Sequence, residues 1–352
     1  MYQNKSLIFK NPPIGWPKPD VDFGVECRPI DINGDIPLGG VILKNCYVSL
    51  DPYQRGRMRA PTVDSYSPPF TIGDPMEGHV ISRVIRSAST KLQPGDFVSG
   101  VGPIQEFSVL SAGVVDGFTR IENPYNLNLE IFLGPLGMPG LTAYSSFYEI
   151  GKPKKGETIF ISAASCAVGQ LVGQLAKREG LYVIGSVGDD EKVEFITKGL
   201  GFDVGFNYKK EVIGEALMRV APEGIDIYFD NVGGQTLESA LYAMRPRGRI
   251  VVSGMISQYN LQPSELYGVK NLFMVITNRI TIQGFIVTDS DMGPKYSAEH
   301  LKNVSQWIYD GSLKPKIHVD TGMDHACQSF INMLKGRKIG KAVLQIADLN
   351  GD

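Results

Sequence analysis

The sequence predicts an α/β fold with two parts, a doubly wound parallel sheet of the Rossmann type and a smaller, mainly β domain. Beyond Thr158, short apolar runs alternate with segments of helical periodicity, as in a parallel sheet covered by helices on both faces. Before that point the chain is rich in glycine and proline and carries short alternating apolar runs. Its 352 residues, 43% of them apolar and 20% charged, suit two domains with substantial cores.

Three short runs in the first part are predicted to be strands, at residues 40–48, 80–85 and 97–101. A charged and aromatic turn, Ser49 to Met58 (S-L-D-P-Y-Q-R-G-R-M), interrupts them. Pro135 to Tyr144 (P-L-G-M-P-G-L-T-A-Y) then places a glycine-rich turn before a helical pattern. We expect a small-molecule site in a cleft between the two parts.

The most informative segment reads as a strand, a tight turn and a helix. An apolar strand, Thr158 to Ile161, leads into the small residues Ala163 to Cys166, and a helical pattern follows up to a stop at Gly180. Small residues let a ligand approach the backbone, and the helix start offers N–H groups to a pyrophosphate. The pattern predicts a dinucleotide site or, taken alone, an ordinary strand–helix turn that binds nothing.

The same unit then repeats along the chain. Predicted strands follow at residues 181–186, 225–230 and 249–253, and predicted helices at residues 190–198, 211–220 and 236–244. Ligands bind such sheets at the carboxyl ends of the strands. The segments that should contact a ligand are therefore Ser186 to Lys192, Asp230 to Gly234 and Ser253 to Asn260.

The end of the second of these strands favours NADPH over NADH. NAD-specific sites carry an acidic side chain there, whereas this chain has Ser186, then Gly188, then Lys192 one turn into the next helix. Tyr208 follows in F-N-Y-K, so that a lysine and a phenol are available as donors to a 2′-phosphate. The alternative is that Lys192 is a solvated helix lysine paired with a neighbouring carboxylate.

Composition excludes several other classes of protein. A net charge of −2 argues against a nucleic-acid-binding surface. No apolar run reaches membrane length and the N-terminus lacks a signal-peptide pattern, so we expect a cytoplasmic protein without membrane contacts. The four cysteines, Cys27, Cys46, Cys166 and Cys327, include no C-x-x-C pair and are expected to be free thiols.

Eight ordered pieces of the chain carry a resemblance to a known family. They are D-P-Y-Q-R-G-R-M (51–58), G-M-P-G-L-T-A-Y (137–144), A-A-S-C-A-V-G-Q-L-V-G-Q-L-A-K (163–177), G-F-D-V-G-F-N-Y-K (201–209), F-D-N-V-G-G (229–234), S-G-M-I-S-Q-Y-N (253–260), I-Q-G-F (282–285) and G-R-K-I-G-K (336–341). The chain resembles the zinc-independent medium-chain dehydrogenase/reductase superfamily. Within it, the resemblance is to the leukotriene/prostaglandin reductases and the plant NADPH-dependent alkenal double-bond reductases.

The resemblance implies a GroES-like catalytic domain that is discontinuous in sequence. Residues 1–127 and 300–352 would form it, around an NADP-binding domain of residues 128–299. A predicted terminal strand, Lys341 to Ile346, with no helix after it, agrees with this return. Relatives commonly form dimers by pairing edge strands near Thr281 to Phe285, so we expect a homodimer.

The resemblance also implies the site residues. Lys192 and Tyr208 would hold the 2′-phosphate. Further cofactor contacts would come from Pro52, Tyr53, Met138, Ser165, Cys166, Ala167, Val168, Gly188, Asn231, Ser253, Tyr259, Phe285, Ile286, Val287 and Lys338. Of these, Pro52, Tyr53 and Met138 would approach from the other domain.

Two positions depart from the family pattern. Cys166 replaces a glycine, so its side chain must point away from the phosphates or the cofactor binds differently. Lys338 replaces an asparagine, and it either forms a salt bridge to phosphate or extends into solvent.

The ligand inventory argues against catalytic zinc, which needs three protein ligands. Gly78-His79 resembles a ligand pair of zinc-dependent alcohol dehydrogenases, but the loop that should supply a cysteine reads Leu50-Asp51-Pro52-Tyr53. His79 is then either a packed histidine or a substrate-pocket residue. The other histidines, His300, His318 and His325, are expected at the surface or in packing.

The expected reaction is NADPH-dependent reduction of the carbon–carbon double bond of an enal or enone. Hydride added to the β-carbon produces an enolate, which a hydrogen-bond donor stabilises. Tyr259 is the candidate donor, with Tyr53 and His79 as further candidate catalytic residues; alternatively, Tyr259 only caps the cofactor. A quinone oxidoreductase and a catalytically silent NADPH-binding protein remain alternatives, and the sequence does not identify the substrate.

Overall fold

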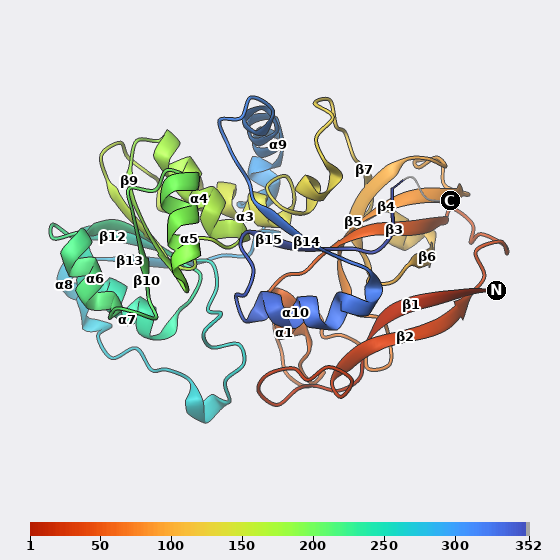
Figure 1. Cartoon of the computed structure of the whole chain (residues 1–352), viewed down its shortest axis with the longest axis horizontal. Helices are drawn as coiled ribbons and strands as arrows, with labels where there is room; N and C mark the ends of the chain where they lie inside the picture. Colours follow the sequence, from red (N-terminus) through yellow and green to blue (C-terminus); the bar gives the residue numbers. More distant parts are fainter. Residues whose placement is uncertain (350–352) are drawn as a thin grey trace. The chain divides into compact units, whose positions relative to one another are not determined.

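The computed structural model describes residues 1–349, which fall into two compact units (Figure 1). One unit holds residues 1–133 and the chain from Ile317 onward, and the other holds residues 134–316. The sequence analysis placed these boundaries at 127/128 and 299/300. A cut at 299/300 would fall inside α9 (Gly293–Tyr309). This helix belongs to the unit of residues 134–316, in which Tyr144 donates a hydrogen bond to Glu299 at 2.6 Å.

The unit of residues 134–316 is built on a six-stranded parallel sheet in the order β10-β9-β8-β11-β12-β13. The strands are β8 (Thr158–Ile161), β9 (Tyr182–Val187), β10 (Val204–Asn207), β11 (Ile225–Asp230), β12 (Met244–Val252) and β13 (Thr281–Gly284). The chain winds outward from β8 and then returns to start again at β11. This doubly wound order confirms the predicted fold class, and its switch point between β8 and β11 is where such sheets bind ligands.

Helices lie before, between and after the strands of this sheet in the chain. They are α3 (Met138–Ser146), α4 (Ala167–Arg178), α5 (Asp190–Glu194), α6 (Ile213–Val220), α7 (Gly234–Ala243), α8 (Phe273–Asn278) and α9. On α4, the consecutive residues 169–176 are all buried, among them Leu171, Val172 and Leu175. The helix predicted at 190–198 is α5 followed by a π-helical turn, Phe195–Gly199.

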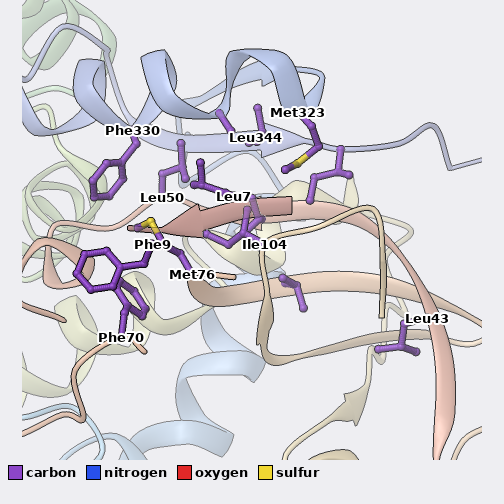
Figure 2. Packing of buried hydrophobic residues seen from close by; sticks show 14 of the residues in the cluster. Leu7, Phe9, Leu43, Leu50, Phe70, Met76, Ile104, Met323, Phe330 and Leu344 are labelled. Carbon is purple, nitrogen blue, oxygen red and sulfur yellow. The ribbon is translucent and has the colours of Figure 1, made fainter. Parts of the chain in front are cut away.

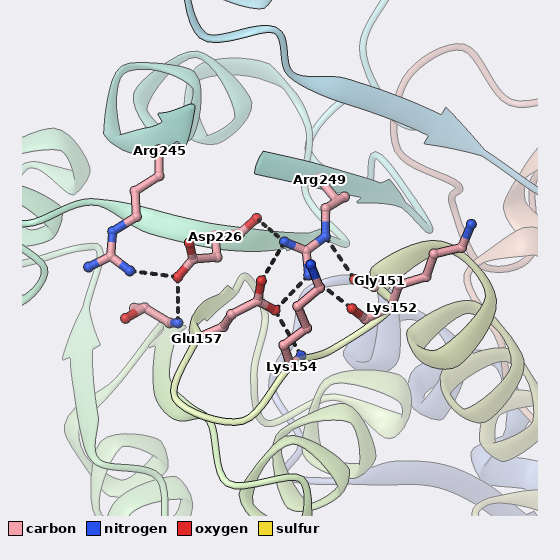
Figure 3. Close-up of polar contacts among 8 residues, drawn as sticks. Gly151, Lys152, Lys154, Glu157, Asp226, Arg245 and Arg249 are labelled. Carbon is pink, nitrogen blue, oxygen red and sulfur yellow. Dashed lines mark hydrogen bonds and ion pairs between the residues drawn. The ribbon is translucent and has the colours of Figure 1, made fainter. Parts of the chain in front are cut away.

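Ion pairs join the strands at the amino end of this sheet (Figure 3). Arg249 of β12 pairs with Glu157 before β8, with 2.6 Å between Nη2 and Oε2. Asp226 of β11 pairs with Arg245 at 2.7 Å and also accepts a hydrogen bond from the Thr158 amide at 2.8 Å. These contacts make the amino edge structural, whereas the candidates from Ser165 to Val287 follow the carboxyl ends of the strands.

The other unit contains a seven-stranded sheet in the order β14-β15-β3-β4-β5-β7, with β6 pairing β3. Its strands are β3 (Val41–Ser49), β4 (Glu77–Ser87), β5 (Phe97–Pro103), β6 (Phe107–Leu110), β7 (Thr119–Arg120), β14 (Ile317–Thr321) and β15 (Lys341–Gln345). A separate antiparallel pair is formed by β1 (Tyr2–Phe9) and β2 (Phe23–Ile30), and short helices are α1 (Tyr53–Arg57), α2 (Ala112–Val115) and α10 (Ala326–Leu334). The predicted terminal strand is β15, which pairs antiparallel with β3.

Both segments of the chain contribute to the core of this unit (Figure 2). Leu7 and Phe9 of β1 are fully buried in one cluster with Phe330 of α10 and Leu344 of β15. Leu50, which follows β3, lies in the same cluster. The C-terminal segment is therefore part of the core that supports the turn from Asp51 to Met58.

Three observations concern the cysteines, membrane spans and metal ligands of the described residues. Cys27, Cys46, Cys166 and Cys327 are free thiols, as predicted. Within residues 1–349, no helix has both the length and the apolar character needed to cross a membrane. Over the same residues, no group of three His, Cys, Asp or Glu side chains is close enough to hold a metal ion.

Candidate functional site

The turn from β8 to α4 adopts a strained conformation that brings backbone amides to the sheet edge. Ala163 has a φ of 48°, and the amide of Ala164 donates to the Ser186 carbonyl at 3.0 Å. Cys166 is the N-cap of α4, and its Sγ accepts from the Gly169 amide at 3.2 Å. The sulfur therefore lies at the helix start and takes one of the amides there. The two alternatives from the sequence, a side chain that points away from the phosphates or a cofactor that binds differently, both stay predictions.

Helix geometry leaves further donors at the same turn. The first N–H groups of α4, on Ala167 and Val168, have no carbonyl one turn earlier to bond. They also lie at the positive end of the helix dipole. Ser165, which precedes the cap, is buried and contributes no exposed surface to this turn.

The end of β9 brings together a glycine, a phenol and a buried lysine. A Cβ on Gly188 would lie 3.0 Å from the hydroxyl oxygen of Tyr208, so a larger residue would crowd the phenol. Lys192 is 7% exposed in its side chain and pairs with Asp189, with 2.9 Å between Nζ and Oδ2. The ammonium is thus paired with Asp189, as the alternative interpretation proposed, but it is buried rather than solvated.

The electrostatics of this cluster favour the charged form of Asp189 and the neutral form of Tyr208. Burial opposes ionisation of Asp189, but its hydrogen bonds to Lys192 and the positive charges nearby hold its pKa below the ordinary value. Burial raises the pKa of Tyr208, and the charge of Asp189 adds to the effect. Tyr208 is therefore protonated at neutral pH and available as a donor. Lys209, which the sequence analysis did not single out, is close enough to Asp189 to affect its pKa.

The ends of β11 and β12 place Asn231, Gly254 and Tyr259 together. The Asn231 side chain donates to the Ser162 carbonyl at 2.8 Å. A Cβ on Gly254 would lie 3.1 Å from the Tyr259 hydroxyl oxygen and 3.5 Å from the Asn231 carbonyl oxygen. Ser253 joins this group through its amide, which donates to the Asp230 carbonyl at 2.9 Å.

The Tyr259 phenol accepts rather than donates its only assigned hydrogen bond within the described residues. The Met255 amide donates to its oxygen at 3.1 Å, so its own proton is available to another acceptor. Burial raises the pKa of Tyr259, and the charge of Asp230 adds to this while the Met255 amide opposes it. The phenol is therefore a neutral hydrogen-bond donor at neutral pH.

Sequence reasoning missed the role of Asp230. It is fully buried, and its Oδ1 accepts from the Tyr228 hydroxyl at 2.6 Å, the Val232 amide at 2.9 Å and the Gly233 amide at 2.8 Å. These bonds hold the glycine turn after β11, where Gly233 has a φ of 69°. An aspartate directly before N-V-G-G, where the turn amides need an acceptor, was the signal that could have found it.

Two further groups of candidates lie elsewhere in the same unit. Phe285, Ile286 and Val287 follow β13 and are half-buried, and the Val287 carbonyl accepts from the Gly293 amide at 2.9 Å. Met138 opens α3 and belongs to residues 134–316, together with the dinucleotide candidates. The prediction that Met138 approaches from the other domain is therefore wrong, because the chain passes into this unit before α3 begins.

The remaining candidates lie in the other unit. Pro52 is the N-cap of α1, Tyr53 is its first residue, and His79 lies on β4. Burial, helped by the charge of Asp51, raises the pKa of Tyr53. Burial lowers the pKa of His79, so the imidazole is neutral at neutral pH. This unit therefore offers an uncharged phenol and an uncharged imidazole.

The side chain of Lys338 does not extend into solvent, and it has an acidic partner. Its Nζ lies 2.7 Å from His318 Nε2 and 3.2 Å from Asp320 Oδ1. The other two histidines have structural contacts: His300 Nε2 lies 2.8 Å from the Pro135 carbonyl, and His325 Nδ1 lies 2.8 Å from the Thr321 carbonyl. A hollow of about 550 Å³ in this unit, lined by residues such as Phe97, Arg120 and Leu349, contains none of the candidate residues.

Comparisons with known proteins cover almost the whole chain. Residues 5–117 match the family described as the N-terminal domain of oxidoreductase, and residues 167–303 match the family described as zinc-binding dehydrogenase. The chain is 43% identical to the 2-alkenal reductase (NADP(+)-dependent) of Nicotiana tabacum, covering 98% of both chains. It is 36% identical to the NADPH-dependent curcumin reductase of Escherichia coli, covering 98% of this chain and 97% of that one.

A solved structure is similar over the same extent. The crystal structure of CurA in complex with NADPH from Vibrio vulnificus matches with a TM-score of 0.86 at 32% identity. The match covers 98% of this chain and 99% of that chain.

Proposed function

Because this chain belongs to the zinc-independent medium-chain dehydrogenase/reductase superfamily, we propose that it uses NADPH to reduce the carbon–carbon double bond of α,β-unsaturated aldehydes and ketones. The names of the tobacco and E. coli relatives support this reaction class. Within the chain, the proposal depends on Tyr259. Its side chain is a neutral phenol whose proton is available at the carboxyl edge of the sheet.

The residues at this edge fit a phosphorylated dinucleotide. The α4 amides of Ala167 and Val168 suit a pyrophosphate, and Gly188 leaves the Tyr208 hydroxyl accessible beside the backbone. Lys192 and Tyr208 would hold the 2′-phosphate, which has to compete with Asp189 for the ammonium. When bound, NADPH supplies the hydride.

The chemistry left to the protein is stabilisation of negative charge. Hydride addition to the β-carbon of an enone places negative charge on the carbonyl oxygen, and a fixed donor lowers the barrier. Tyr259 would donate to that oxygen, and Tyr259 or water would protonate the α-carbon. Tyr53 and His79 would contribute uncharged polar contacts to the substrate.

Product analysis tests the proposal. The purified protein is incubated with NADPH and, separately, with 2-alkenals, cyclic enones and quinones. A saturated aldehyde or ketone with an intact carbonyl supports the proposal. Hydroquinone as the main product would replace it with a quinone oxidoreductase, and NADPH binding without turnover would leave only a cofactor-binding protein. Turnover that a chelator abolishes and added zinc restores would contradict the zinc-independent reaction.

We also propose that the protein is a homodimer formed at the β13 edge. Among the strands of residues 1–349, β13 pairs only with β12, and its four residues are exposed. An exposed edge strand presents unpaired backbone groups to a second chain. The cytoplasmic location expected from the sequence stays a prediction.

A further inference from the structure

A buried lysine at the start of the last strand reaches the turn that carries Tyr53. Lys341 is 1% exposed, although lysine is rarely buried. Its Nζ lies 2.6 Å from the Leu50 carbonyl oxygen, 3.0 Å from Asp51 Oδ1 and 2.9 Å from the Ala342 carbonyl oxygen. Three acceptors match the three protons of an ammonium group, so the site is built for a charged lysine.

Asp51 is bound from its other side by residues of the same turn. It is 3% exposed, its Oδ2 accepts from the Ser49 hydroxyl, and its amide donates to Gln54 Oε1 at 2.9 Å. The Gln54 side chain donates in turn to the Glu77 carbonyl at 3.0 Å. The turn is thereby joined to β4 two residues before His79.

Stability alone does not explain an ion pair at this position. Taking two charges out of water costs several kcal/mol per ion, and apolar residues of similar volume often replace such a pair without loss. The position of Asp51 in the chain explains the ion pair, because Asp51 directly precedes Pro52 and Tyr53. The charge of Asp51 raises the pKa of Tyr53 and opposes the burial that lowers the pKa of His79, while Lys341 reinforces that lowering.

We propose that Lys341 is a positioning residue that acts through Asp51: bound to the turn that carries Tyr53, its ammonium cancels the negative charge of Asp51 beside His79. The functional part rests on the proposed reaction, in which the substrate gains negative charge. An unpaired carboxylate near the substrate would oppose that charge, and its effect is large in a medium of low dielectric constant. The C-terminal segment therefore contributes to the electrostatics of the unit that carries Tyr53 and His79 as well as to its core.

The pH dependence of the site involves every ionisable group near this pair. They are Tyr53 and Arg57 of α1, Glu77 and His79 of β4, Tyr66 of the following loop, and Lys341 of β15. Arg57 pairs with Glu77 at 2.7 Å, and Lys341 is the cation that pairs with Asp51.

The test compares Lys341→Met, which leaves Asp51 alone, with the neutral double variant Asp51→Asn/Lys341→Met. The His79 ring is titrated by NMR and assigned with His79→Asn, and kcat/KM for a 2-alkenal is measured against pH. We expect Lys341→Met to raise the pKa of His79 by about half a unit or more. We expect its kcat/KM to fall at least about tenfold, with a changed pH profile because the pKa of His79 moves.

The double variant should recover most of kcat/KM and lose the change in pH profile, because it restores neutrality but not the lysine contacts. Lys5→Met is the matched control, since Lys5 pairs with Asp324 at 2.7 Å on the surface of the same unit. It should change neither readout.

An unchanged His79 titration in Lys341→Met, or a double variant as impaired as the single one at every pH, overturns the inference. If Lys341→Met does not fold, the double variant and Asp51→Asn decide it, since Asp51→Asn leaves the ammonium alone and should lower the pKa of His79 further. Absence of turnover in the unmodified protein would contradict the proposed function instead, and the His79 titration would still test the charge balance.

Discussion

At the scale of single residues, we expect Lys192 to decide which cofactor the proposed site accepts. Replacing it with alanine removes the ammonium assigned to the 2′-phosphate and leaves the unpaired carboxylate of Asp189, which repels phosphate. We expect the KM for NADPH to rise at least about tenfold, while the KM for NADH changes by less than about twofold. Steady-state kinetics with both cofactors measure this. Lys198→Ala, on the adjoining π-helical turn, is the exposed control, and equal effects on both cofactors would remove the assignment.

Tyr259 can act on the substrate or only on the cofactor, and one substitution separates the two roles. Tyr259→Phe keeps the ring but removes the proton donor. We expect kcat for a 2-alkenal to fall about 100-fold with little change in the KM for NADPH, because the lost bond is strongest when negative charge develops. Tyr242→Phe, at a position 66% exposed on α7, should have no effect. A raised KM for NADPH at unchanged kcat would instead assign Tyr259 to capping the cofactor.

Residues with local signals were predictable, and residues with distant partners were not. Lys192 follows a strand end that can be read from the sequence, and Tyr208 was found in the F-N-Y-K segment of the family resemblance. The structure brings both to Gly188 and Asp189. Lys341 carries no such signal, because its partner Asp51 lies 290 positions away in the chain. A buried pair of this kind emerges only when the strand pairing is known.

At the scale of elements, α9 packs on α3 around a buried histidine. His300 is 1% exposed, and burial lowers its pKa to about 4 although the Pro135 carbonyl opposes the shift. The unfolded chain binds this proton below a pKa near 6.5, whereas the folded chain does not until about pH 4. The free energy of unfolding should therefore fall as pH drops from 6.5 to 4, by on the order of 2 kcal/mol at pH 5.

Urea unfolding at pH 7.5 and pH 5 measures this effect. His300→Gln retains an N–H donor for the Pro135 carbonyl but cannot take up a proton. The variant should lose less stability than the unmodified protein between the two pH values. Parallel losses in the two proteins would show that other groups govern the acid sensitivity.

Element boundaries differ from prediction where glycine and proline interrupt a pattern. The segment M-R-P-R-G reads as a turn between a helix and a strand, but β12 already begins at Met244. A register shift between β11 and β12 and a φ of 70° at Arg247 accommodate the extra residues. β10 (Val204–Asn207) was not predicted because four residues with a glycine carry too weak a strand signal.

At the scale of the whole molecule, the doubly wound order was predictable because alternating strands and helices allow few other topologies. The division of the chain between the two units was less predictable from the sequence. The composition of residues 300–316 does not separate them from the C-terminal segment. They nevertheless belong to the unit of residues 134–316, where they contact α4. Gln170 and Gln174 bind the backbone of Lys316 and Lys314, with 2.8 Å and 2.7 Å from the lysine amides to the glutamine oxygens.

The assembly is the remaining prediction at this scale. The helix that precedes β13 in the chain, α8, buries none of its residues, and Phe273 and Ile276 are each 71% exposed. An apolar surface next to an unpaired strand edge is the pattern of an interface between copies. We expect the protein to be a dimer by size-exclusion chromatography with light scattering, and the double variant Phe273→Glu/Ile276→Glu to be a monomer because like charges would meet at the interface. Tyr309→Glu, at a position 64% exposed on α9, should remain dimeric. A monomeric unmodified protein, or a dimer that survives both glutamates, would place the interface elsewhere or remove it.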